Sequence, residues 1–137
     1  MASAVAFRYA RALVDLVMAP ESPLKPPEAV EQLRAVEELI SGSAELRTAL
    51  LTPAIQTSRK RAIVGTLLER MSISHLIRNF TFVVINHRRV TIMGEIREAF
   101  EQVLDERVGV VRARVNSAVP LDERRNAALE AELSKLT

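Results

Sequence analysis

Residues 79–90, "NFTFVVINHRRV", decide how this chain folds. Positions 80–85 are apolar almost throughout, and a short run of this kind suits a buried strand, a membrane-touching segment or a helix. Its surroundings favour a helix, because Ser74 is a suitable N-cap and the distance from there to Asn86 is a helical length. The cationic "HRR" that follows suits the negative end of a helix dipole. We therefore predict a helix that ends in a basic turn.

Working outward, the apolar spacing predicts further helices on both sides of this segment. Residues 3–19 form the first, with Ser3 as its cap, and a stiff proline-rich linker follows at 20–27. The other predicted helices run from Pro27 to about Ile40, over "AELRTALL" after Ser43, from Thr57 or Ser58 to Met71, and over 91–107. The chain has one Tyr, four Phe and no Trp, so its core is built mainly from aliphatic residues, as suits packed helices.

Beyond Gly109 the pattern changes to a period of two. The stretch "VVRARVNSAV" alternates apolar and polar residues and predicts a strand over 109–118, and "LDERRNAALEAELSKL" predicts a helix after it. A single strand has no ladder partner, so we expect residues 108–137 to open a second module that is truncated or incomplete in this chain. The predicted fold class is mainly α, with a six-helix bundle at 1–107 followed by the opening strand and helix of an incomplete α/β module.

The residue inventory argues against catalysis. The chain has no cysteine, its only histidines are His75 and His87, and its four glycines are scattered singly. No pattern suggests a nucleophile with its base, a set of metal ligands or a phosphate-binding loop, so we expect no catalytic, metal or cofactor site. The net charge of +2 neither supports nor excludes a nucleic-acid partner. No apolar run approaches the ~20 residues of a membrane-spanning helix.

Stretches spread over nearly the whole chain resemble one known family. They are "FRYARALVDL" (7–16), "LLTPAI" followed by Lys60 (50–60), "NHRRVTIMGEIREAF" (86–100) and "GVVRARVNSAVPLDE" (109–123). In this order and spacing they resemble the delta subunit of the F-type ATP synthase, whose mitochondrial counterpart is the oligomycin sensitivity-conferring protein.

The resemblance implies a fold and a function. It implies an amino-terminal bundle of six helices, and a non-catalytic stator subunit that links the catalytic F1 head to the peripheral stalk, so that proton flow stays coupled to ATP synthesis. Such a subunit is peripheral, on the cytoplasmic face of a bacterial energy-transducing membrane. Its carboxy-terminal module meets the b-subunit stalk, and a groove between its first and fifth helices takes the amino-terminal helix of an alpha subunit.

Carried over by position, the partner-binding groove uses seven residues of this chain: Tyr9, Ala12, Leu13, Leu16, Val83, Val84 and His87. Both helices are apolar on more than one side, so the sequence leaves open which of these residues face the groove and which face the core.

A second reading comes from a different class of protein. The stretch "FRYARALVDL" is also similar to the opening of all-helical transcription antitermination factors that bind RNA. Those proteins usually have a denser arginine run there, and they lack a strand such as the one predicted at 109–118. The delta-subunit reading therefore leads, with RNA binding as the alternative.

Overall fold

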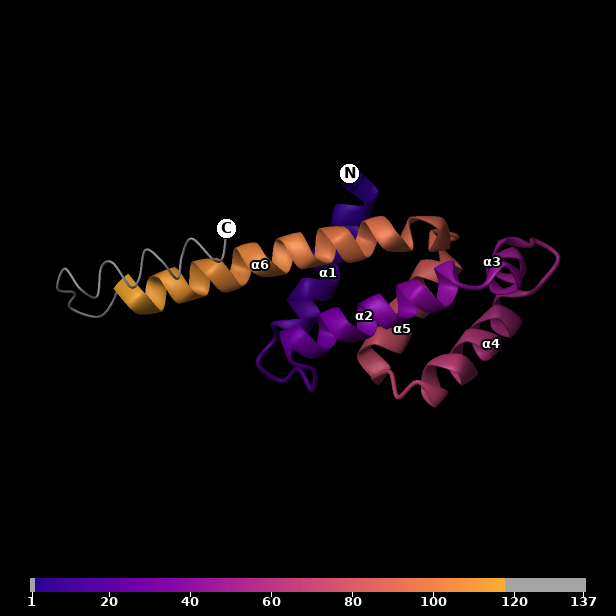
Figure 1. The fold of residues 1–137 in the computed structure, drawn as a ribbon, viewed down its shortest axis with the longest axis horizontal. Helices are drawn as coiled ribbons and strands as arrows, with labels where there is room; N and C mark the ends of the chain where they lie inside the picture. The colour runs from indigo at the N-terminus through magenta and orange to yellow at the C-terminus, as the bar shows by residue number, and fades with distance from the viewer. Residues whose placement is uncertain (1, 118–137) are drawn as a thin grey trace. The chain divides into compact units, whose positions relative to one another are not determined.

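The computed structural model describes the backbone of residues 2–117 and the side chains of residues 2–109 (Figure 1). The chain divides into two compact units, Met1–Phe100 and Glu101–Thr137. The elements in chain order are α1 (Ala4–Val17), α2 (Pro26–Ser41), α3 (Ala44–Leu51), α4 (Thr57–Arg70), α5 (His75–Asn86), the 3-10 helix η1 (Val90–Ile92) and α6 (Met93–Ser117). The mainly helical fold predicted from the sequence is confirmed.

Serine side chains set the start of three helices. Ser3, Ser43 and Ser74 precede α1, α3 and α5, and each hydroxyl accepts a hydrogen bond from the backbone N–H three residues further on. A cap of this kind stabilises a helix by about 1 kcal/mol, because it satisfies one of the donors that lack a partner at the helix start. The sequence predicted all three caps.

The ends of α4 and α5 share one backbone motif. Ser72 and Arg88 adopt positive φ angles of 58° and 57°, just beyond the two helices. At the end of α5 the Arg88 N–H donates to the Ile85 carbonyl at 3.0 Å, and the Arg89 N–H donates to the Val84 carbonyl at 2.9 Å. This is the Schellman pattern, in which a left-handed residue stops the helix and satisfies its last carbonyls. It turns the chain sharply into η1.

The core of the first unit is mainly aliphatic, and Phe100 is its one fully buried aromatic side chain among the described residues. Its fully buried side chains come from α1, α2, α4, α5 and α6 and include Leu13, Val14, Leu33, Val36, Val64, Leu68, Ile77, Val84, Ile96 and Phe100. Within it, α5 packs against both α2 and α4. The buried Thr81 of α5 is satisfied locally, because its hydroxyl donates to the Ile77 carbonyl at 2.8 Å. Arg97 near the start of α6 donates to Glu37 of α2 at 2.6 Å and ties the two helices together.

The strand expected over 109–118 is wrong for residues 109–117, which continue α6 as helix. A strand needs a neighbour for its backbone groups, and residues 2–117 contain no second strand, whereas a helix satisfies these groups within itself. Arginine and alanine in the stretch are also strong helix formers. Residue 118 and the helix predicted after it lie outside the described part of the chain, and the second module at 108–137 stays a prediction.

Candidate functional site

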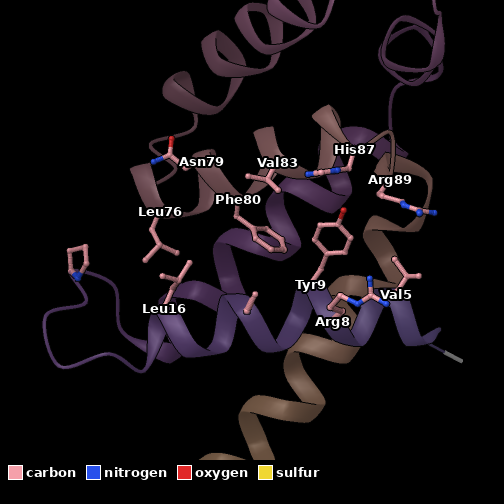
Figure 2. A pocket seen from close by; sticks show the side chains of 12 residues that line it. Val5, Arg8, Tyr9, Leu16, Leu76, Asn79, Phe80, Val83, His87 and Arg89 are labelled. Atoms are coloured by element: carbon pink, nitrogen blue, oxygen red, sulfur yellow. The ribbon is translucent and has the colours of Figure 1, made fainter.

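A groove of about 870 Å³ runs between α1 and α5 in the first unit (Figure 2). We call it the α1–α5 groove. Twelve residues line it: Val5, Arg8, Tyr9, Ala12 and Leu16 of α1, Pro23 of the linker, Leu76, Asn79, Phe80 and Val83 of α5, and His87 and Arg89 just beyond α5.

The two helices contribute residues at matching intervals. Positions 5, 9, 12 and 16 of α1 line the groove, as do positions 76, 80, 83 and 87 on and just after α5. Residues three and four apart lie on one face of a helix, so each set is one continuous stripe. The core-facing residues of α1 (Ala6, Ala10, Leu13, Val14 and Val17) form a different stripe. The first helix therefore has two apolar faces, of which only one is covered by the bundle.

Ring contacts fix how the two walls of the groove are aligned. The Tyr9 ring centroid lies 6.4 Å from that of Phe80 and 6.4 Å from that of His87, both in edge-to-face arrangements. The amino-terminal half of α1 therefore faces the carboxy-terminal half of α5, and the helices run antiparallel, as Figure 2 shows. Phe80 is only 7% exposed, so it forms part of the floor of the groove.

Apolar side chains stand open to solvent along the groove. Leu16 is 53% exposed and Val83 is 44% exposed, although both are large hydrophobic residues on regular helices. Such side chains gathered in a concave surface are typical of an interaction site, where a partner removes them from water. The arrangement suits the apolar face of a ligand.

Polar groups in the groove are basic or neutral. Arg8, His87 and Arg89 are exposed, and none of the twelve lining residues carries a carboxylate. Elsewhere in residues 2–117, no group of three or more His, Asp or Glu side chains is placed to hold a metal ion. His75, the other histidine, lies beside Arg78 with 2.9 Å between its Nδ1 and the guanidinium.

Comparison with known proteins identifies the family. The family model described as "ATP synthase delta (OSCP) subunit" matches residues 5–137. The chain belongs to the ATP synthase delta (OSCP) subunit family. The groove is therefore a feature of a subunit of a larger enzyme complex, and the RNA-binding alternative is set aside.

Individual relatives agree with this assignment. An "ATP synthase subunit delta" from Trichlorobacter lovleyi is 35% identical over 135 residues, which is 98% of this chain and 73% of the relative. Proteins of the same name from Acidobacterium capsulatum and from Anaeromyxobacter sp. strain Fw109-5 are 31% and 35% identical and cover 98% and 97% of this chain, with 74% and 73% of their own lengths matched. No solved structure matches the chain significantly.

The fold places the seven residues that the delta-subunit resemblance suggested in two different environments. Tyr9, Ala12, Leu16, Val83 and His87 come together as lining residues of the α1–α5 groove. Leu13 and Val84 have no exposed surface and belong to the bundle core. Neighbouring positions on a helix point about 100° apart, so one residue of each adjacent pair faces the groove and the other faces inward.

The remaining lining residues were not among the seven that the delta-family resemblance suggested for the groove. Val5, Leu76 and Phe80 extend the two stripes at helical intervals, so the same periodicity applied further along each helix would have found them. Arg8 and Asn79 flank the stripes. Pro23 and Arg89 come from segments beyond the helix ends, where no period applies, and only the folded chain brings them to the groove.

No helix in the part of this delta-family chain that the structure describes is both long enough and apolar enough to span a membrane.

Proposed function

We propose that this chain is a stator subunit of an F-type ATP synthase, and that its α1–α5 groove takes the amphipathic amino-terminal helix of an alpha subunit. It performs no catalysis itself. It links the catalytic F1 head to the peripheral stalk, so that the head does not turn with the rotor and proton flow stays coupled to ATP synthesis. Its place is peripheral, on the cytoplasmic face of a bacterial energy-transducing membrane. Family membership supports the stator role.

The open apolar groove is the observation that carries the proposal. The stripe on α1 from Val5 to Leu16 covers eleven residue steps, or about 16 Å along the helix axis. That length matches about three turns of a second helix laid along the groove. Helix-in-groove recognition uses anchors at intervals of three and four residues on the ligand, and both walls offer apolar contacts at the same intervals.

The energetics fit a contact of this kind. Complete burial of a leucine or valine side chain contributes about 1.5–3 kcal/mol. Leu16 and Val83 are already about half covered, so each has roughly 1 kcal/mol left to contribute when a partner covers it. Because association also costs translational and side-chain freedom, a stable link needs the whole stripe rather than one anchor.

The proposal extends to a second partner. The family resemblance implies that the carboxy-terminal module, residues 108–137, binds the b subunit of the peripheral stalk. A subunit that holds the head through one region and the stalk through another transmits force between them only if both contacts persist. Cross-linking of the assembled complex, with photoreactive groups placed in residues 108–137, tests this contact separately from the groove.

Isothermal titration calorimetry tests the groove proposal. The titrant is a synthetic peptide of the first ~20 residues of the alpha subunit from the same organism, long enough for a helix of several turns. We expect binding at micromolar concentrations or tighter, with a negative heat-capacity change because apolar surface is buried. A scrambled peptide of the same composition is the control. The absence of binding at micromolar concentrations would contradict the proposal.

A further inference from the structure

We propose that the α1–α5 groove is polarised by charge, and that Arg8 and Arg89 bind a carboxylate on one end of the partner helix and so fix the direction in which that helix lies. This inference rests on the proposed function, because it concerns the ligand of the same groove. It adds a specificity that the apolar stripes alone do not supply.

The antiparallel arrangement gathers the cations at one end of the groove. The rings of Tyr9 and His87 are in contact across the groove. Arg8 is next to Tyr9 in the sequence, and Arg89 is two residues after His87. Figure 2 shows Arg8 and Arg89 near Val5, whereas Leu16 and Leu76 lie at the opposite end. Two antiparallel helices therefore place both arginines at one end of the groove and large aliphatic side chains at the other.

Both guanidinium groups are available to a ligand. Arg8 and Arg89 are exposed, and neither guanidinium group makes a hydrogen bond or an ion pair within the part of the chain that the structure describes. Two neighbouring arginines of the first unit have partners for their guanidinium groups. Arg97 bonds to Glu37, and the Arg11 guanidinium lies 5.7 Å from the ring centre of Phe7.

At the turn after α5, backbone donors already bond two of the carbonyls that the Arg89 side chain could use. Basic side chains beyond a helix end often hydrogen-bond the last carbonyls of that helix. Here the backbone N–H groups of Arg88 and Arg89 already bond the carbonyls of Ile85 and Val84. The Schellman turn therefore occupies two of the terminal acceptors with backbone donors, and the Arg89 side chain is left at the edge of the groove.

A carboxylate is the group that this pair recognises best. The planar guanidinium fork matches the two oxygens of a carboxylate, and such charge-assisted pairs are shorter and more directional than neutral hydrogen bonds. With no acidic residue among the lining side chains, the groove offers no internal competitor. The opposite end, with Leu16, Pro23 and Leu76, presents no cation, so a helix docked in the reverse direction leaves its carboxylate unpaired.

The test uses the same alpha-subunit peptide and a matched form in which every Asp is replaced by Asn and every Glu by Gln. Calorimetry at about 20 mM salt measures both peptides against the native chain. We expect the amide form to bind about tenfold more weakly, or about threefold for each arginine that loses its partner. The difference shrinks at about 500 mM salt, where exposed charges are screened.

Variants of the protein show where the charge preference resides. The double variant R8Q and R89Q is expected to bind the two peptides with equal affinity, whereas R11Q removes a charge from α1 outside the groove and keeps the preference. Equal binding of both peptides by the native chain would overturn the charge inference and leave the groove proposal standing. Failure of both peptides to bind would instead count against the groove proposal itself. A preference that persists in the double variant would also overturn the assignment to these arginines.

Direction is measured independently of affinity. A nitroxide attached to the peptide terminus nearest its carboxylates broadens the NMR signals of nearby methyl groups in the isotope-labelled protein. We expect broadening at Val5 and not at Leu76, and the reverse pattern with the label at the other terminus. Equal broadening at both ends of the groove from either label would show that the helix binds in both directions and would overturn the inference.

Discussion

At the scale of single residues, adjacent positions on α1 and α5 have opposite environments. Ala12 is exposed in the groove while Leu13 is fully buried, and Val83 is 44% exposed while Val84 is fully buried. The family resemblance located both segments but could not separate the members of each pair. The distinction depends on how each helix is rotated against the bundle, and this is set by packing from distant parts of the chain.

This difference predicts separable effects for two leucine truncations on one helix. Leu13→Ala leaves a cavity in the core and is expected to lower the free energy of unfolding by about 2–5 kcal/mol. Leu16→Ala removes a side chain that is 53% exposed, so we expect little loss of stability and a clear loss of peptide affinity. Urea unfolding and calorimetric titration measure the two effects. Equal destabilisation by both variants would contradict the assigned rotation of α1.

A charge in the middle of the groove tests the site more severely. Ala12→Asp places a carboxylate between the two apolar walls, where a bound helix would have to desolvate it. We expect the alpha-subunit peptide no longer to bind, with far-UV circular dichroism unchanged because Ala12 is exposed. The native α1 already carries a carboxylate at an exposed position, Asp15, so an exposed Asp is compatible with this helix. Unchanged affinity would remove Ala12 from the site.

The backbone of Arg88 offers a stabilising substitution. A residue with a side chain in the left-handed region is strained by about 1 kcal/mol or more relative to glycine, and Arg88 has a φ of 57°. Arg88→Gly is therefore expected to raise the free energy of unfolding by about 0.5–1 kcal/mol, measured by urea denaturation. Asn86→Gly, inside the last turn of α5, is the control and should give no gain. A loss of stability in Arg88→Gly would show that its side chain makes contacts that outweigh the strain.

At the scale of elements, the sequence predicted all six α-helices, but it missed that α6 continues as helix over residues 109–117. Serine caps start α1, α3 and α5, while apolar stripes at helical spacing and prolines or turns mark the five helices from α1 to α5, and these local signals agree with one another. The alternation after Gly109 is also compatible with helix, because arginine, alanine and valine at these positions do not exclude it. A period of two predicts a strand only when a neighbouring strand is available to pair with it.

Gly109 distinguishes the two conformations in solution. In the interior of a helix, glycine to alanine stabilises by up to about 1 kcal/mol, whereas in a strand the exchange brings little gain. We expect Gly109→Ala to increase the hydrogen-exchange protection of amides 110–117, since Gly109 lies inside α6. The helix-breaking variant Gly109→Pro is the opposite control. Unchanged protection in Gly109→Ala would contradict a continuous helix through this region.

At the scale of the whole molecule, composition and apolar spacing predicted the mainly α fold. They did not predict the α1–α5 groove. A core of aliphatic residues with few aromatics is typical of packed helices, and the first unit confirms it. The groove is assembled from α1, the linker, α5 and the turn beyond it. Only the family resemblance pointed to the pairing of the first and fifth helices, and it missed residues such as Pro23 and Arg89 that lie outside regular elements.

Partner binding should stabilise the entire first unit. A ligand that binds the folded state alone adds RT ln(1 + [L]/Kd) to the free energy of unfolding, or about 2.7 kcal/mol at a hundredfold excess over Kd. We expect the alpha-subunit peptide to raise the thermal midpoint of the native chain in a concentration-dependent manner, measured by circular dichroism. Ala12→Asp, which we expect not to bind the peptide, should show no shift. A shift of equal size in that variant would place the peptide elsewhere on the molecule.

The distance along the chain between the two walls of the groove has a consequence for assembly. Tyr9 and His87 meet in the folded protein, although 78 peptide bonds separate them. A nascent chain from which α1 but not α5 has left the ribosome has only one wall of the groove. It therefore cannot form the α1–α5 groove. If the groove takes the alpha-subunit helix as proposed, we expect binding only after synthesis has passed Arg89 and the bundle has folded.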